Sequence, residues 1–231
     1  MATFVLVHGA WHGAWCWRRV ARLLTRAGHD VFTPTLTGLA ERSHLLNPDI
    51  NLDTHILDIV NEMKWQELSG VTLLGHSYGG MVISGVAEKM EKAIASLVML
   101  DAFMPEDGES VLDIYPPAMR EPVLAAVRSG ATTMPPRAAA LFKVNEKDRA
   151  WVDAQCTPQP IQCWLQKLKL TGARERIAKK TYIRAAGYQS PYFDAGLATA
   201  RQRGYRTYEV PCGHDVMLDM PERLAQILQE A

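Results

Sequence analysis

The sequence predicts an α/β fold, with a mostly parallel sheet covered on both faces by helices. A small helical cap is expected as an insertion in the chain after the fourth predicted strand. Short apolar, β-branched runs alternate with segments of helix length at both ends of the chain, as a covered parallel sheet requires. Between them, residues 105–178 hold eight of the 13 prolines and only short helix-like pieces, so the alternation stops there. We therefore expect a core of residues 1–104 and 179–231, with residues 105–178 forming the cap.

The first half of the core alternates regularly between the two kinds of segment. Gly28 closes the first helical pattern, because a left-handed terminal residue favours glycine, and Asn51 or Asp53 is available to cap the second helix. Pro34 stops the second strand. In chain order, the pattern predicts strands over 3–7, 30–33, 71–74 and 95–100, and helices over about 15–27, 52–64 and 81–90.

The remaining predicted helices and strands lie in the cap and in the second half of the core. Within the cap, residues 138–142 and 161–170 are helix-like. After it, the alternation resumes with strands over 181–184 and 205–210 and helices over 192–203 and 221–229.

Charge and hydropathy exclude several function classes. Lys plus Arg and Asp plus Glu both number 25, so the formal net charge is zero, and the chain lacks the basic surface of a nucleic-acid-binding protein. No basic cluster favours anionic membranes, and the apolar runs are far shorter than the ~20 residues that span a bilayer. The N-terminus has no charged region or cleavage site typical of a signal peptide. We expect a soluble, cytoplasmic protein.

The four cysteines form no CxxC pair, so the sequence predicts neither a metal site nor a redox motif. We expect Cys16, Cys156, Cys163 and Cys212 to be buried thiols, with Cys212 close enough to His214 to sense the site. No metal and no organic cofactor is expected.

Gly75-His76-Ser77-Tyr78-Gly79 has the Gly-x-Ser-x-Gly pattern of a nucleophile elbow. Its chemistry needs a serine on a sharp strand-to-helix turn, and the glycines remove Cβ atoms that would collide in that bend. An apolar strand-like run precedes the pattern and a helix-like run follows it, which is the required context. Ser77 is therefore the predicted nucleophile.

A serine nucleophile also needs two backbone N–H groups to stabilise the oxyanion, and a histidine base. The residue after the serine, Tyr78, supplies one N–H, and the loop after the first strand places Ala10 to supply the other. Of seven histidines, only His214 follows a late strand, where this chain order requires the base. His8, His12 and His76 lie on loops near the predicted site, where structural or substrate-contact roles are expected.

Three segments resemble the methylesterase and hydroxynitrile lyase group of the α/β-hydrolase superfamily: residues 4–17, 75–80 and 102–105. The resemblance implies the α/β-hydrolase fold and hydrolysis of small esters, with carbamates also cleaved by some bacterial members. Lyases of this group carry threonine where this chain has Gly9, and lysine where it has Asp215. Because that lysine stabilises departing cyanide, the aspartate favours hydrolysis over lyase activity.

The group usually places its catalytic acid near residues 186–188, yet residues 184–190 contain no carboxylate. Asp101 ends the strand after the nucleophile strand, at the sheet edge where catalytic groups gather, and some lipases resemble this sequence in carrying the acid there. The sequence therefore predicts Asp101 as the acid, with Asp194 as the alternative. Asp215 neighbours the histidine itself and is poorly placed to reach its Nδ1.

These residues predict a serine hydrolase that cleaves small hydrophobic carboxylic or carbamic esters, aromatic or short-chain, through an acyl-enzyme. Trp11, His12, His76 and Phe103 are the candidate substrate-pocket residues. The expected partner is a small-molecule ester, with no nucleic acid and no membrane; the sequence indicates no oligomeric state. Two alternatives remain open: a non-catalytic small-ligand receptor on the same fold, and a hydroxynitrile lyase or C–C bond hydrolase.

Overall fold

A six-stranded parallel sheet organises the molecule. The computed structural model describes residues 1–231, and its sheet has the strand order β2-β1-β3-β4-β7-β8, with every neighbouring pair parallel. The strand order reverses between β1 and β3, and ligands of open α/β sheets bind at the carboxyl ends of strands beside such a point. The strands are β1 Thr3–Val7, β2 Asp30–Phe32, β3 Val71–His76, β4 Ile94–Leu100, β7 Lys179–Ala185 and β8 Arg206–Val210.

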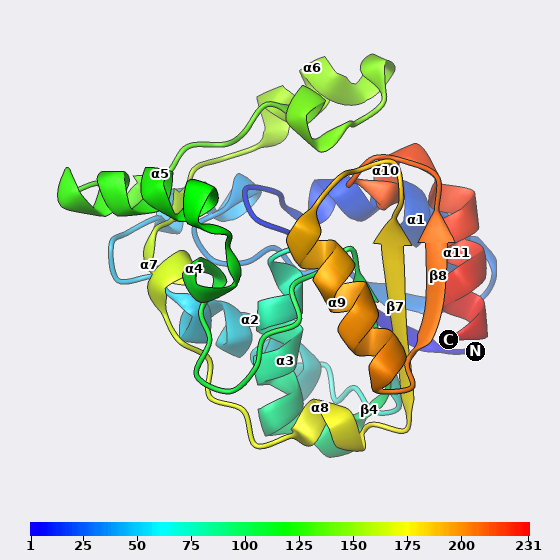
Figure 1. The fold of residues 1–231 in the computed structure, drawn as a ribbon. Helices are drawn as coiled ribbons and strands as arrows, with labels where there is room; N and C mark the ends of the chain where they lie inside the picture. The colour runs from blue at the N-terminus through cyan, green and yellow to red at the C-terminus, as the bar shows by residue number, and fades with distance from the viewer.

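Helices cover both faces of this sheet, which confirms the predicted α/β fold. In Figure 1, α2, α3 and α9 lie to one side of β7 and β8, α1 and α11 lie to the other, and α10 lies above the ends of these strands. Asn51 caps α2 in a capping box with Thr54, and Ser190 caps α9 before a proline at its first turn. The bounds are α1 Arg18–Arg26, α2 Leu52–Trp65, α3 Gly79–Met90, α9 Pro191–Gln202, α10 Val216–Asp219 and α11 Pro221–Glu230.

The chain between β4 and β7 contains short helices and a two-stranded antiparallel sheet. Figure 1 shows α4, α5, α6 and α7 beside and above the strand ends. The elements of this segment are α4 Val111–Ile114, α5 Pro117–Arg128, β5 Thr133–Met134, the 3₁₀ turn Ala139–Phe142, α6 Glu146–Gln155, β6 Gln159–Pro160, α7 Gln162–Leu165 and α8 Ala173–Arg176. Elsewhere in the chain, 3₁₀ turns cover Ala14–Trp17, Ala40–Leu45 and Glu91–Ala93.

Local structure in this segment differs from the sequence-based expectation. The helix-like pattern over 161–170 forms only the single turn of α7, because the backbone of Gln166 is extended. In contrast, α5 is a full helix although it contains two prolines: Pro117 occupies the first turn, where no N–H is required, and Pro122 lies inside it. Proline spacing therefore concealed the longest helix between β4 and β7.

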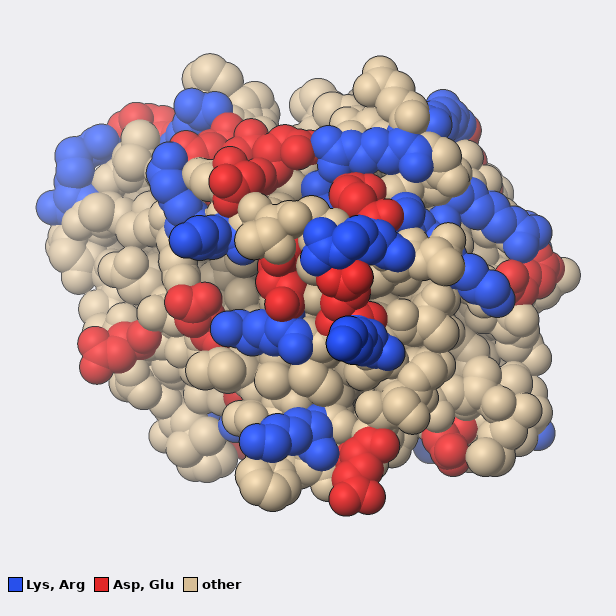
Figure 2. Space-filling view, turned by 90° about the horizontal axis from the view of Figure 1, so that it is seen from below, with Lys and Arg blue, Asp and Glu red and all other residues tan.

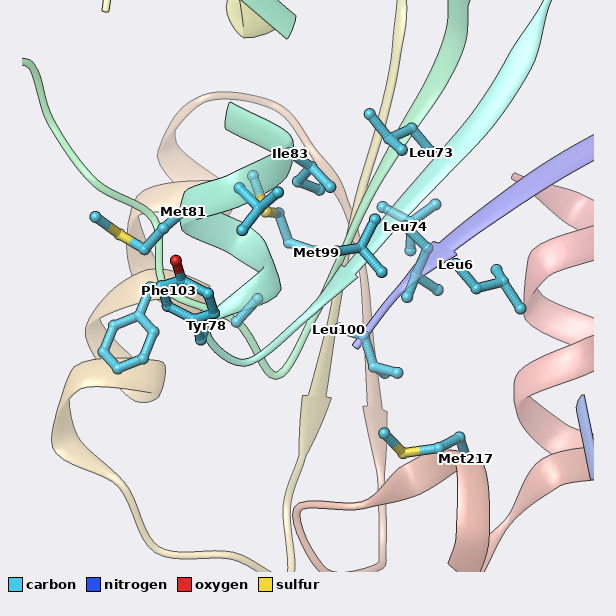
Figure 3. Close-up of a cluster of buried hydrophobic side chains, with 14 of the residues drawn as sticks. Leu6, Leu73, Leu74, Tyr78, Met81, Ile83, Met99, Leu100, Phe103 and Met217 are labelled. Carbon is cyan, nitrogen blue, oxygen red and sulfur yellow. The ribbon is translucent and has the colours of Figure 1, made fainter. Parts of the chain in front are cut away.

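One hydrophobic core of 63 buried residues joins the sheet, its helices and the segment between β4 and β7. Figure 3 shows Leu73 and Leu74 of β3 packed with Met99 and Leu100 of β4, and Tyr78 and Phe103 beside α3. All residues of β3 are buried, as expected for a parallel strand covered on both faces. The turn that follows β3 is thus held on a rigid platform.

The surface seen in Figure 2, from below Figure 1, carries interleaved acidic and basic side chains. Several surface charges of the molecule are paired: Arg176 pairs with Glu91 at 2.6 Å, and Arg203 pairs with Glu106 at 2.5 Å and with Glu175 at 2.9 Å. Charges of both signs are mixed there, as on an ordinary solvated surface. None of the helices has the length and apolar character that crossing a bilayer demands.

Candidate active site

Ser77 occupies a strained turn between β3 and α3. Its φ of 54° lies in the left-handed region, which non-glycine residues rarely adopt and which marks functional sites. A Cβ at position 75 would lie 2.4 Å from the carbonyl oxygen of Gly79, and a Cβ at position 79 would lie 2.8 Å from that of Val7. Glycine at both positions therefore allows the bend that presents the Ser77 hydroxyl above the sheet.

His214 lies in the loop after β8, 113 positions after Asp101 but in direct contact with it. The Nδ1 of His214 lies 2.6 Å from Oδ2 of Asp101, and both side chains are buried. The backbone N–H of His214 donates to the carbonyl oxygen of Phe142, which fixes the loop. Ser77 and His214 line the same pocket at the carboxyl edge of the sheet.

Asp101 directly follows β4 and is itself held by its neighbours. Its φ is 41°, and its backbone N–H donates to the carbonyl oxygen of Ile183 on β7. The second carboxylate oxygen, Oδ1, accepts hydrogen bonds from the Arg184 guanidinium at 2.8 Å and from the Ala185 N–H at 3.1 Å. These bonds leave Oδ2 aimed at the imidazole of His214.

Arg184 is a site residue that sequence reasoning missed. Burial opposes its charge, but the carboxylates of Asp101 and Asp194 outweigh burial and raise the pKa of Arg184 above its ordinary value. Asp194, the alternative acid, lies on α9 with an exposed side chain and bonds to Arg184 at 2.9 Å instead of to His214. The available signal was a charged residue directly after the apolar pair Tyr182 and Ile183, in the buried half of β7.

The two predicted oxyanion donors flank Ser77 with free N–H groups. Ala10 follows β1 and Tyr78 follows Ser77, and both residues line the pocket that contains the serine. Neither backbone N–H donates a hydrogen bond within the protein. Two unpaired amides at one pocket are the arrangement that stabilises a developing oxyanion.

Ser77 and His214 are not joined by a hydrogen bond in the structure, and the imidazole bonds only to Asp101. In many hydrolases this contact is long in the free enzyme and shortens when substrate binds.

The pocket around Ser77 is small and mostly aromatic. The candidate residues Trp11 and Phe103 line it. Tyr115, Tyr192 and Phe193, which the sequence did not indicate, line it too. Its cavity volume is about 20 Å³, so it holds little more than a water molecule as it stands. An ester can enter only if side chains around it move.

The prediction that His12 and His76 line this pocket is wrong. Both are buried and face Asp215 behind it: Nε2 of His12 lies 3.1 Å and Nε2 of His76 lies 3.9 Å from the Asp215 carboxylate. Nε2 of His76 also lies 3.1 Å from the carbonyl oxygen of His214. His12 and His76 therefore contact the loop that carries His214, because Asp215 of that loop lies between their rings.

Electrostatics distinguishes the two histidines. Burial opposes the charge on His12, but the Asp215 carboxylate outweighs it and raises the pKa of His12. Burial also works against the Asp215 charge, yet His12 holds the pKa of that carboxyl well below its usual range. Burial, reinforced by the nearby His214, lowers the pKa of His76 well below its ordinary value. The charged forms of His12 and Asp215 therefore stabilise each other, whereas the surroundings of His76 disfavour its charged form.

The remaining candidates have structural positions. Burial lowers the pKa of His8 to about 3, so it is a neutral ring, with Nδ1 near the Gly9 carbonyl oxygen and Nε2 accepting from the Leu36 N–H. The four cysteines are free thiols, but only Cys16 and Cys163 are fully buried. Burial raises the pKa of the Cys212 thiol to about 12, which makes it a poor nucleophile. No group of three or more His, Cys, Asp or Glu side chains is arranged to hold a metal ion.

Comparisons with known proteins identify the family of this chain. The family model of the alpha/beta hydrolase family matches residues 4–227. A carbendazim hydrolyzing esterase from Nocardioides sp. strain SG-4G is 43% identical over 238 aligned positions, covering 99% of this chain and 98% of the relative. Methylesterase 10 of Arabidopsis thaliana is 27% identical, covering 98% of this chain and 90% of the relative.

Among solved structures, an extracellular alpha/beta-hydrolase from a Paenibacillus species superimposes with a TM-score of 0.89. That protein is 27% identical, the match covers 100% of this chain and 99% of the other, and it is described as sharing structural and functional homology with tobacco salicylic acid binding protein 2. The chain belongs to the alpha/beta hydrolase family, and it is a hydrolase of the carboxylesterase type.

Proposed function

We propose that the protein is a serine esterase that cleaves small hydrophobic carboxylic or carbamic esters through an acyl-enzyme. The observation that carries the proposal is the 2.6 Å contact between Asp101 and His214 at the pocket that also contains Ser77. A nucleophile, a base and an acid in this order and at one sheet edge are the groups that serine catalysis requires.

In the proposed first half-reaction, Ser77 Oγ attacks the ester carbonyl and His214 Nε2 takes the hydroxyl proton. Asp101 accepts a hydrogen bond from Nδ1 of His214, so the proton of the neutral ring stays on Nδ1 and Nε2 is free to accept the serine proton. The carboxylate also stabilises the imidazolium that forms. The N–H groups of Ala10 and Tyr78 stabilise the oxyanion. The intermediate then expels the alcohol, which receives the proton from His214.

In the second half-reaction, water replaces the alcohol. His214 removes a proton from the water as it attacks the acyl carbonyl, and returns it to Ser77 Oγ when the acid leaves. A carbamic ester follows the same steps through a carbamoyl-enzyme. No group outside the chain and the water is required for either step.

The substrate class is supported by the pocket and by the relatives. Ten of the 13 residues that line the pocket are hydrophobic, which favours small apolar esters over charged ones at the reacting end. The Nocardioides relative is named for hydrolysis of carbendazim, a methyl carbamate on an aromatic ring system, and the Arabidopsis relative is a methylesterase. The first name fits a methyl carbamate of an aromatic compound as the substrate, and the second fits a methyl ester.

Burst kinetics with p-nitrophenyl acetate and labelling by a serine-directed fluorophosphonate test this proposal. We expect a burst of about one p-nitrophenol per protein, labelling at Ser77, and loss of both in Ser77→Ala. A protein that binds aromatic esters but shows neither turnover nor labelling would instead be a ligand receptor. Cleavage of mandelonitrile faster than of any ester would favour the lyase alternative.

A further inference from the structure

A second chamber lies next to the pocket of Ser77. Its cavity volume is about 350 Å³, against about 20 Å³ for the pocket at the serine, and it is within the range of ligand sites. Its walls are α5 and the segment 134–136, both between β4 and β7. The space for a substrate is therefore beside the reacting serine and not around it.

The two cavities share one partition of side chains. Trp11, Tyr115, Arg137 and Trp164 line both of them. Trp11 and Trp164 are neighbours, with ring centroids 5.4 Å apart, and Nε1 of Trp164 donates to the hydroxyl of Tyr115 across 3.4 Å. That distance is long for a hydrogen bond, whereas Nε1 of Trp11 donates to the carbonyl oxygen of Met134 at 3.1 Å. Tyr115 and Trp164 are therefore the less constrained part of the partition.

Arg137 brings an unpaired positive charge to this partition. Its side chain is exposed and takes part in no salt bridge and no hydrogen bond within the protein, and its guanidinium stacks over the ring of Phe142 at 5.5 Å. The Arg184 guanidinium, in contrast, is paired with Asp101. A free guanidinium over an aromatic ring offers two donors to a carboxylate and a face to a flat ring.

Resting on the proposed esterase function, we propose that the outer chamber binds the non-reacting end of an aromatic ester, and that Arg137 selects an anionic group on that end. The substrate class is the monoester of an aromatic dicarboxylic acid, or a ring with an equivalent anion away from the ester. The ester reaches Ser77 between Tyr115 and Trp164, while the ring stays among apolar side chains of α5 such as Met119 and Val123.

The first test compares two substrates of the same shape, monomethyl terephthalate and methyl 4-nitrobenzoate. In Arg137→Met, we expect KM for the carboxylate-bearing ester to rise about three- to fivefold, the effect of losing one exposed charge pair. The kcat should change less than twofold, because the contact is made at the non-reacting end. The KM for the nitro ester, which has no anion, should change less than twofold in Arg137→Met. Arg128→Met, which removes a charge from the C-terminal end of α5, should change KM for neither ester. An equal loss on both esters would overturn the selection by Arg137.

The second test fills the outer chamber without touching the core. Ala118 is exposed on α5 and lines the chamber, whereas Ala125 is exposed on the same helix and does not. We expect Ala118→Trp to lower kcat/KM for the two aromatic esters at least tenfold and to leave methyl butyrate unchanged, while Ala125→Trp changes neither. Equal effects of the two tryptophans would contradict an outer binding site.

Labelling by a small alkyl fluorophosphonate separates this proposal from the esterase function. We expect Arg137→Met and Ala118→Trp to label at the wild-type rate, because the reagent needs only Ser77, His214, Asp101 and the oxyanion donors. A wild-type protein that neither labels nor cleaves methyl butyrate would overturn the esterase function and this proposal with it. A wild-type protein that does both, with no difference between the matched variants, would overturn only the outer site.

Discussion

Two buried carboxylates flank His214, and their surroundings give them opposite tasks. Asp101 comes from a different strand, yet it touches the imidazole at 2.6 Å while Arg184 holds its other oxygen. Asp215 is the next residue in the chain, yet it turns away and pairs with His12 at 3.1 Å. Strand order at the sheet edge, and not closeness in sequence, therefore decides which carboxylate contacts the imidazole.

We expect the largest loss of activity from a change of the nucleophile Ser77 and not of either carboxylate. We expect Ser77→Ala to lower kcat on the order of 10⁴-fold or more, as removal of a nucleophile does in other triads. The fold should persist, because Ser77 is only partly buried and its hydroxyl bonds to nothing. Steady-state hydrolysis of p-nitrophenyl acetate measures the loss; activity within tenfold of wild type would remove Ser77 from the mechanism.

Asp101→Asn should have the next largest effect. The amide preserves the shape but presents the wrong partner to His214 Nδ1, so we expect kcat to fall by roughly 10²–10⁴-fold. Circular dichroism provides the check on folding. A near-neutral Asp101→Asn would show that His214 works without this carboxylate.

Asp215→Asn should act on stability more than on turnover. Removing one member of a buried ion pair costs about 3–5 kcal/mol, whereas the imidazole of His214 keeps its bond to Asp101. We expect kcat within about tenfold of wild type for the folded fraction and a lower urea midpoint. A kcat loss as large as that of Asp101→Asn, with an unchanged midpoint, would reverse the roles of the two carboxylates.

The same pair predicts how stability depends on pH. The pKa of Asp215 is lowered, so its contribution is full above its ordinary value and is lost as the pH falls through the folded-state pKa. The pKa of His12 is raised, so its contribution is full below its ordinary value and is lost as the pH rises through the folded-state pKa. The stability difference between wild type and Asp215→Asn should therefore be largest from about pH 4 to 6.5 and smaller at pH 9. Urea unfolding at pH 5 and pH 9 checks this; a difference that grows with pH would contradict the ion pair.

The smallest effect should come from the exposed alternative acid. Asp194 bonds to Arg184 from the solvent side, and Arg184 keeps its contact with Asp101 without it. We expect Asp194→Asn to lower kcat less than tenfold. The reverse order, with Asp194→Asn more damaging than Asp101→Asn, would move the acid to α9.

The sheet and its edge could be predicted because local patterns determine them. Apolar runs predicted the six strands of the main sheet. The spacing of Gly75, Ser77 and Gly79 indicated a turn in which the positions on either side of the serine leave no room for a Cβ atom. The position of Asp101 at the end of β4 followed from parallel strands meeting at one edge. Its contact with His214 was expected from that position, and its part in catalysis stays a prediction.

The pocket could not be predicted in the same way, because side chains from distant segments form it. Tyr115 and Trp164 meet across 49 positions, and no local pattern indicates that meeting. The prolines of α5 concealed a helix that lines the outer chamber. His12 and His76 were misplaced because a loop position shows closeness to the site but not the side to which a ring points.

The central claim is that Asp101 makes His214 an effective base for Ser77, and the rate of fluorophosphonate labelling tests it most directly. The reagent reports the attack of the serine alone, and peptide mapping identifies the labelled residue. We predict a single adduct at Ser77, formed at least 10²-fold more slowly in Asp101→Asn than in wild type and at close to the wild-type rate in Asp194→Asn. An adduct on another residue, or an equal rate in wild type and Asp101→Asn, would contradict the account.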